Sequence, residues 1–124
     1  MIGQDKGSFE VLQFGFSKDK FHVYYNDTIV EGADPASFEF ITGTMWTKDN
    51  HAYYFKGIVM PQVDYNTFRY LDFNYAIDKN NVYYNDEVIE GADAKSFVHI
   101  KNSQDGRDIN GCYHYGKKVD CNKL

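Results

Sequence analysis

The chain lacks most of the features that commonly reveal a function. It has only 2 cysteines, 2 prolines and 1 tryptophan in 124 residues, and no apolar run is long enough to cross a membrane. It contains no glycine-rich phosphate loop, no His-Glu-x-x-His zinc motif and no serine elbow. The amino terminus lacks the charged and apolar regions of a signal peptide. These absences argue against membrane insertion, and they predict no catalytic, metal-binding or cofactor-binding residues.

Aromatic residues and negative charge, by contrast, are plentiful. The chain has 11 Tyr and 10 Phe, and more Tyr than a small core needs, so we expect the surplus to form a protein-binding surface. The formal net charge of −5 argues against a nucleic-acid partner, which usually requires a basic patch. A protein partner is therefore expected, and no cofactor.

One motif, Asp-x-x-Ser/Thr-Phe, recurs along the chain at intervals of 29 or 30 residues. Its aspartates are Asp5, Asp34, Asp64 and Asp93. A period of this length is typical of a repeat protein. No linker rich in Gly, Ser or Pro interrupts the chain, so the sequence predicts a single domain over residues 1–124. It divides into a half repeat (1–12), three repeats (13–41, 42–71 and 72–101) and a degenerate C-terminal hairpin (102–124).

Each repeat has the pattern of an antiparallel β-hairpin. Asn26-Asp27 and Asn85-Asp86 suit a two-residue turn, which pairs Tyr24 with Ile29 and Tyr83 with Val88. Lys56-Gly57 in the second repeat departs from this pattern, and we expect a loop one residue longer there.

The Asp-x-x-Ser/Thr-Phe motif predicts the connection that follows each hairpin. Asp34 and Asp93 are placed to cap short helical turns that bring Phe38 and Phe97 into the core. The predicted fold class is all-β, with repeated hairpins of about 29–30 residues joined by short helical turns.

The third repeat carries a family resemblance. Asp78-Lys79-Asn80-Asn81-Val82-Tyr83-Tyr84, Glu90-Gly91-Ala92-Asp93 and Ser96-Phe97 resemble the DKNYY domain family of bacterial proteins. The resemblance covers most of the chain, although Met60-Pro61-Gln62-Val63 departs from it. It implies a bacterial origin and a β-rich repeat, and it assigns no site residues.

Candidate partner-binding residues come from the strand entrances and from the aromatic residues. They are Asp19, Asp49, Asp78, Tyr25, Tyr54, Tyr84 and Trp46. The three aspartates each adjoin a lysine, and we expect a solvated rim of local salt bridges there rather than a pair of catalytic carboxylates. Trp46 is expected to anchor the core or an interface.

The histidines and cysteines support no catalytic or zinc site. His22 and His51 share a repeat position that Asn81 fills in the third copy, which indicates a structural, half-exposed position. Cys112 and Cys121 are candidates for a disulfide, which would indicate an oxidising compartment; free thiols would indicate the cytoplasm. A turn at Gly116-Lys117 would place them face to face, whereas a turn at Tyr115-Gly116 would offset them by two residues.

These features favour a non-enzymatic protein-binding domain. The first hypothesis is a cytoplasmic bacterial immunity protein that binds and neutralises a toxin domain, with a basic nuclease as the partner that its negative charge suits. The alternative is a structural or adhesive repeat module of an exported bacterial protein. An enzyme is the third and least supported class.

Overall fold

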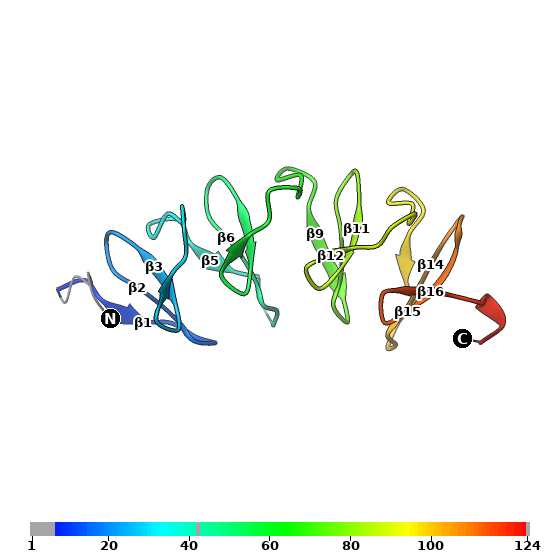
Figure 1. Cartoon of the computed structure of the whole chain (residues 1–124), viewed down its shortest axis with the longest axis horizontal. Coiled ribbons are helices and arrows are strands. Elements are labelled where there is room, and N and C mark those ends of the chain that lie inside the picture. Colours follow the sequence, from blue (N-terminus) through cyan, green and yellow to red (C-terminus); the bar gives the residue numbers. More distant parts are fainter. Residues whose placement is uncertain (1–6, 42, 124) are drawn as a thin grey trace. The chain divides into compact units, whose positions relative to one another are not determined.

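The computed structural model describes residues 7–41 and 43–123, and in this part of the chain β-strands dominate (Figure 1). The strands form four antiparallel sheets of four strands each, and within each sheet the strands lie in chain order. The all-β fold that the sequence predicts is confirmed. The chain divides into two compact units, residues 1–61 and 62–124, and each unit contains two sheets.

Most of the strands are only two or three residues long. In unit 1 the first sheet contains β1 (Glu10–Val11), β2 (Phe16–Lys18), β3 (Val23–Tyr25) and β4 (Thr28–Ile29), and the second contains β5 (Glu39–Phe40), β6 (Trp46–Lys48), β7 (Tyr53–Phe55) and β8 (Ile58–Val59). In unit 2 the third sheet contains β9 (Arg69–Asp72), β10 (Tyr75–Ile77), β11 (Val82–Tyr84) and β12 (Glu87–Val88). The fourth contains β13 (Val98–His99), β14 (Asp105–Asp108), β15 (Gly111–His114) and β16 (Lys117–Val119), followed by the short 3₁₀ helix η1 (Cys121–Lys123).

The sheets are offset from the repeats read in the sequence. The segment after each motif phenylalanine pairs forward with the next hairpin, so that Glu39 lies opposite Lys48 and Phe40 opposite Thr47. Each sheet therefore takes its first strand from the end of one sequence repeat and its other three strands from the next. Asp5, the first motif aspartate, lies outside the described residues.

The hairpin turns follow the predicted register. Tyr24 lies opposite Ile29 and Tyr83 opposite Val88, as predicted, and Asn26 and Asn85 adopt positive φ values of 54° and 55°. The longer loop expected in the second repeat is wrong, because Phe55 pairs with Ile58 across a two-residue turn. Lys56 and Gly57 both have positive φ, 48° and 79°, which gives the twist that a two-residue hairpin requires.

The short helical turns predicted between hairpins are not found, and η1 is the single helix among the described residues. The motif segments form one hydrogen-bonded turn each: Phe68 N–H donates to Asp64 C=O at 3.1 Å, and Phe97 N–H donates to Asp93 C=O at 3.0 Å. A helix does not propagate from one such turn, because the residues that follow extend at once into the next strand.

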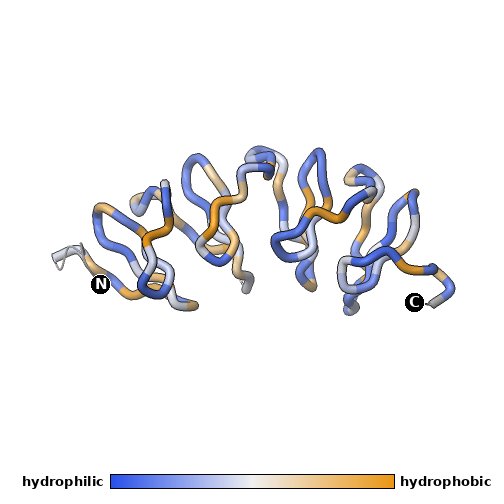
Figure 2. The backbone as a smooth tube through the Cα atoms, in the orientation of Figure 1, coloured by the Kyte–Doolittle hydropathy of each residue, from blue (hydrophilic) through white to orange (hydrophobic). Residues whose placement is uncertain are grey.

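Each unit has its own hydrophobic cluster, built from the apolar segments that alternate with polar turns along the chain (Figure 2). In unit 1 the buried members are Phe16, Val23, Val30, Phe38 and Tyr54, and in unit 2 they are Tyr75, Ile77, Val82, Ile89, Phe97 and Tyr113. Both clusters join residues of two successive sheets. Phe38 and Phe97 are buried, as the sequence predicts.

Candidate functional site

The strand-entry aspartates are the most regular polar feature of the structure. Asp19, Asp49 and Asp78 are only 2, 2 and 3% exposed. The solvated rim of salt bridges predicted for them is therefore wrong. The neighbouring lysines pair elsewhere instead: Lys18 with Glu10 and Lys48 with Glu39, for example. The aspartates turn inward because the backbone at each strand entrance folds around the carboxylate.

Each of these carboxylates, and that of Asp108 at the same position in the fourth sheet, accepts a hydrogen bond from a tyrosine five residues later. The distances are 2.9 Å for Tyr24 Oη to Asp19, 2.7 Å for Tyr54 to Asp49, 2.7 Å for Tyr83 to Asp78 and 3.0 Å for Tyr113 to Asp108. In the third sheet Asp78 Oδ1 also accepts the N–H groups of Asn80 and Asn81, at 2.8 and 2.7 Å. Aspartate commonly stabilises a turn by this local side-chain-to-backbone bonding.

In the second, third and fourth sheets the same carboxylates connect the sheet to the motif turn before it. The backbone N–H groups of Asp34, Asp64 and Asp93 donate to Asp49, Asp78 and Asp108 at 2.8, 2.8 and 2.7 Å. The motif hydroxyl adds a second link, since Thr67 Oγ1 accepts the Lys79 N–H at 2.9 Å and Ser96 Oγ accepts the Ile109 N–H at 3.0 Å. We call this arrangement of aspartate, tyrosine and motif turn the joint.

The motif phenylalanine completes the joint. Its ring packs against the joint tyrosine in all four sheets, with centroid separations of 6.5 Å for Phe9–Tyr24, 6.3 Å for Phe38–Tyr54, 6.1 Å for Phe68–Tyr83 and 5.8 Å for Phe97–Tyr113. Such pairs add to the stability gained from burial alone. The motif is thus a connector between sheets, with its polar and aromatic residues both engaged.

Burial and hydrogen bonding shift the pKa values of Asp49, Asp78 and Tyr113 within the joint. Burial alone would raise the pKa of Asp78, but hydrogen bonds from Asp64, Tyr83, Asn80 and Asn81 outweigh it and lower the pKa below its ordinary value. Asp49 behaves in the same way. Burial, followed by the hydrogen bond to Asp108, raises the pKa of Tyr113 to about 12. A general acid or base works best with a pKa near the working pH, so these groups are suited to structure rather than to proton transfer.

Most of the residues predicted to contact a partner lie in the interior. Trp46 and Tyr54 are each 1% exposed, and Trp46 packs edge-on against Phe55 at 5.2 Å. Tyr25 and Tyr84 are half-buried. Trp46, Tyr54 and the three aspartates are buried in the folded chain, since strands and turns cover them.

The surplus of surface tyrosine predicted from the composition is also wrong. Tyr115 is the one tyrosine that is mainly exposed, and all 11 lie within the described residues. Tyr25 and Tyr84 are partly covered because each lies against the hairpin turn of the following sheet, where Gly57 and Gly116 approach them. A Cβ atom at Gly57 would lie 2.9 Å from Tyr25 Cβ, and one at Gly116 would lie 2.5 Å from Tyr84 Cβ, so both turns need glycine.

Each histidine has its own local surroundings. His22 and His51 are exposed at their shared repeat position, and His99 Nε2 lies 2.6 Å from Ser103 O while its ring stacks on Phe73. His114 Nδ1 contacts Asp105. Among residues 7–41 and 43–123, no group of three or more His, Cys, Asp or Glu side chains is arranged to hold a metal ion. No helix in the same ranges is both long and apolar enough to cross a membrane.

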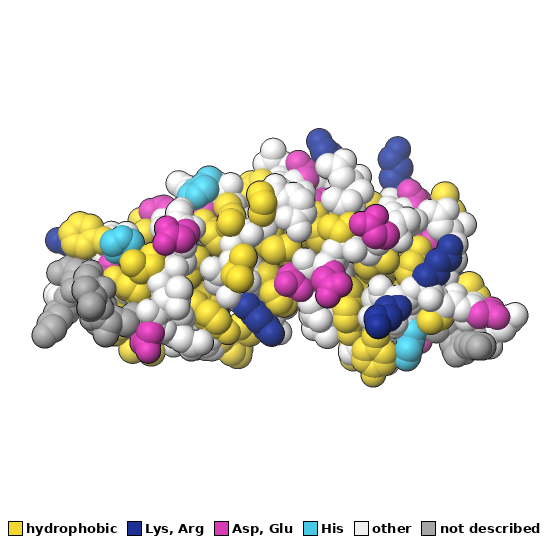
Figure 3. All heavy atoms as spheres, viewed as in Figure 1, with side chains coloured by type: hydrophobic (Ala, Val, Ile, Leu, Met, Phe, Trp, Pro, Cys, Tyr) yellow, Lys and Arg dark blue, Asp and Glu magenta, His cyan; other side chains and the backbone are white. Residues whose placement is uncertain are grey.

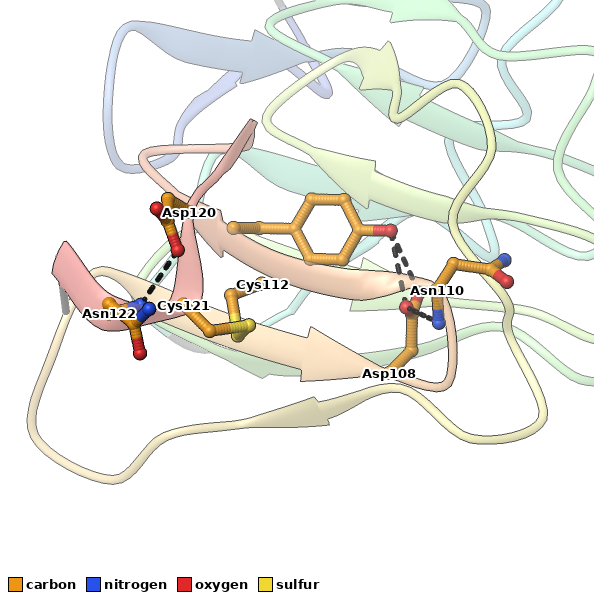
Figure 4. The surroundings of a disulfide bond; sticks show 7 residues. Asp108, Asn110, Cys112, Asp120, Cys121 and Asn122 are labelled. Atoms are coloured by element: carbon orange, nitrogen blue, oxygen red, sulfur yellow. Dashed lines mark hydrogen bonds between the residues drawn. A yellow bond between two sulfur atoms is a disulfide. The ribbon is translucent and has the colours of Figure 1, made fainter.

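Cys112 and Cys121 form a disulfide in unit 2 (Figure 4). Cys112 lies in β15 opposite Val119, and the hairpin turn is Tyr115-Gly116, so the repeat register holds and Cys121 lies two residues beyond its facing position. The bridge forms because the chain bends into η1 after β16, which brings the two Cα atoms to 5.1 Å.

Sequence reasoning missed the side chains that differ between corresponding positions on the surface. Ile58 is exposed on β8, where the third sheet has Glu87, and Arg69 of β9 stands where β1 has Glu10. Aligning the repeats by their joint aspartates, and then reading the positions that differ rather than those that agree, would have found them.

Comparison with known proteins identifies one family. The model of the DKNYY family matches residues 1–117. No curated protein and no solved structure matches the chain.

Proposed function

We propose that this chain, which belongs to the DKNYY family, is a non-enzymatic, protein-binding repeat module of an exported bacterial protein. The observation that carries the proposal is a set of exposed apolar side chains on the return strands of unit 1. Ile58 and Val59 of β8 are 69 and 43% exposed, and Ile29 of β4 is 37% exposed. Single exposed apolar residues are ordinary, but here Ile29 and Val59 occupy the same position of successive sheets, and Ile58 lies beside Val59.

The backbone of these strands supports the same proposal. The return strands β4 and β8 lie at the edges of their sheets. Val30 N–H donates to Val23 C=O at 2.8 Å, and Met60 N–H donates to Tyr53 C=O at 2.9 Å. Hydrogen-bonded and non-hydrogen-bonded pairs alternate in an antiparallel ladder, so the peptide groups of Ile29 and Val59 point away from their own sheets. A partner would meet apolar side chains and outward-facing peptide groups together.

The surface shown in Figure 3 has separate apolar side chains rather than one continuous hydrophobic face. Figure 3 shows apolar side chains (yellow) reaching the surface between scattered acidic and basic ones. Interfaces that form and dissociate commonly have this mixed character. We therefore expect contact through a few apolar residues, with charged residues around them.

The disulfide supports the assignment to an exported protein. Disulfides persist mainly in oxidising compartments, and the Cys112–Cys121 bridge accounts for both cysteines of the chain. The formal net charge of −5 favours a second candidate, a cytoplasmic immunity protein that neutralises a basic toxin domain, because opposite charge accelerates encounter. The two candidates differ in the compartment and in the state of the cysteines.

Site-specific photocrosslinking in the native bacterium tests the binding surface. A photoreactive amino acid replaces Ile58 in one strain and Glu87 in another, because these residues hold the same repeat position in the second and third sheets. We expect discrete protein adducts from position 58 and few from position 87. Equal adduct yields at the two positions, from folded protein, would contradict the proposed surface.

Thiol trapping distinguishes the two candidates. Cells are quenched in acid and treated with a maleimide of known mass before the protein is analysed. An exported module is expected to carry no label on Cys112 or Cys121. Labelling of both cysteines would instead favour the cytoplasmic immunity protein.

A further inference from the structure

Two shallow hollows lie at the same place in the repeat, one in each unit. The unit 1 hollow, of about 290 Å³, is lined by Ser8, Glu10, Lys18, Asp19, Lys20 and Ala36, among others. The unit 2 hollow, of about 260 Å³, is lined at the corresponding positions by Thr67, Arg69, Ile77, Asp78, Lys79 and Lys95. Both hollows form beside a joint, so the backbone around them is alike. The two hollows differ in the side chains that line them.

The charges in the unit 1 hollow are balanced. Lys18 Nζ donates to the carbonyl oxygen of Pro35 at 2.9 Å and lies 3.8 Å from Glu10 Oε1. Its cation therefore already has partners, and the Glu10 carboxylate would repel an anion. The charged side chains that line this hollow are Lys18, Lys20, Glu10 and Asp19, so its two cations are matched by two carboxylates.

The unit 2 hollow has an excess of positive charge. Arg69 replaces Glu10, and Lys95 replaces Ala36. Lys79 is 63% exposed and lies 4.0 Å from Asp64, at the limit of an ion pair. The carboxylate that lines this hollow belongs to Asp78, which is buried and already accepts four hydrogen bonds within the joint. Three cations thus surround a hollow whose one lining carboxylate is directed into the fold.

Apolar surface adjoins these cations. Ile77 replaces Lys18 in the lining of the unit 2 hollow. A second hollow of about 350 Å³ shares Arg69 and is lined by Leu71, Asp72, Phe97, Val98, His99 and Lys101. Arg69 therefore lies between a basic hollow and a partly apolar one. A ligand that carries both carboxylates and apolar groups is complementary to the pair.

We propose that Arg69, Lys79 and Lys95 bind the carboxylates of an acidic peptide segment, whose apolar residues contact Leu71 and the exposed Val98. A polyphosphate or a nucleic acid would leave this apolar surface unused, because neither carries apolar groups next to its phosphates. The biological meaning of this site rests on the proposed protein-binding function, with the acidic segment belonging to a partner. The site is separate from the apolar return strands of unit 1.

Fluorescence anisotropy with a labelled octapeptide of alternating Glu and Leu tests the site. We expect saturable binding that Arg69→Glu weakens by at least about tenfold, since charge-assisted hydrogen bonds are lost and a repulsive carboxylate takes their place. Lys95→Ala, which reproduces Ala36 of unit 1, should weaken binding by a smaller factor. Lys20→Ala is the matched control, because Lys20 holds the position of Lys79 in the unit 1 hollow and should not affect binding.

Two further arms complete the test. A peptide with Ser in place of Leu should bind more weakly, and tripolyphosphate at equal charge should not displace the Glu-Leu peptide. Unchanged affinity in Lys95→Ala, or efficient displacement by tripolyphosphate, would overturn the proposal. Lys95→Ala changes a single exposed side chain, so it decides the question even if Arg69→Glu fails to fold. Because the probe is synthetic and acts on unit 2, its failure leaves the crosslinking result at Ile58 unaffected.

Discussion

Units 1 and 2 share a backbone plan but carry different side chains at corresponding surface positions. The return strand β8 of unit 1 exposes Ile58 and Val59, whereas β16 of unit 2 has Lys117 and Lys118 at the same positions. The hollow beside the joint contains an internal Glu10–Lys18 pair in unit 1, and three cations in unit 2. Unit 2 alone has a disulfide.

This comparison separates two kinds of residue in a repeat protein. The joint aspartate, its tyrosine and the motif phenylalanine recur in every sheet because each sheet must attach to the motif turn before it. Stability in such arrays comes from the repeats and from their nearest-neighbour contacts. The residues that differ between repeats do not make these attachments. Binding specificity is therefore expected to depend on them.

The largest effect is expected from the buried motif phenylalanines. Phe38→Ala and Phe97→Ala should each lower the free energy of unfolding by about 3–5 kcal/mol, because a cavity replaces a buried ring. Urea unfolding followed by circular dichroism measures the loss. Phe21→Ala is the control, since Phe21 is 60% exposed and its removal should change little. A large loss of stability in one of these variants and none in the other would show that the joints of Phe38 and Phe97 are not equivalent.

The next largest effect is expected at the joint aspartates. Asp49→Ala or Asp78→Ala leaves backbone N–H groups and a buried tyrosine hydroxyl without an acceptor, and it should cost about 3 kcal/mol. Similar losses in the two variants would support one joint design throughout the chain. Urea midpoints identical to wild type would show that the network contributes nothing measurable.

The disulfide should stabilise unit 2 selectively. Cys112→Ser with Cys121→Ser opens a loop with a sequence separation of 9, and a loop of this size predicts a loss of about 2–3 kcal/mol. Hydrogen exchange should show faster opening of β15 and β16, while β2 and β3 of unit 1 keep their protection. Equal acceleration in both units would mean that the bridge acts on the whole chain.

Acid should produce a smaller, graded loss of stability. Asp49 and Asp78 have folded-state pKa values below the ordinary 3.8, so the unfolded chain binds protons at these sites more readily than the folded chain. Their contribution is complete above about pH 4 and declines as the pH falls through the unfolded pKa toward the folded one. Urea midpoints between pH 6 and pH 2.5 should show the decline, and Asp78→Asn should flatten it.

The smallest stability effect is expected on the exposed return strand. Ile58→Lys gives β8 the residue that β16 has at this position, and it should change the free energy of unfolding by no more than about 0.5 kcal/mol. If the exposed apolar residues serve binding, the same variant should still abolish the adduct obtained with a photoreactive residue at position 59. A large loss of stability would show that Ile58 supports the fold instead.

Local features of the sequence were enough to predict much of the fold. The 29–30-residue period, the two-residue turns at Asn26 and Asn85 and the pairing of Tyr24 with Ile29 all follow from residues close together in the chain. The helical turns were predicted wrongly because a capping aspartate indicates a turn without showing how far the helix continues. The longer loop at Lys56 was predicted wrongly because glycine allows the same two-residue turn.

The repeat, the strand order within each hairpin and the register of its turns can be read from the residues alone, since these depend on side-chain period and on local backbone preference. The burial of Asp78 cannot, because it depends on the three-dimensional fold bringing the backbone N–H of Asp64 and the phenol of Tyr83 to the same carboxylate. The fold likewise places Arg69, Lys79 and Lys95 around one hollow. These residues come from separate segments, and no periodic pattern in one segment specifies which side chains of another will meet it.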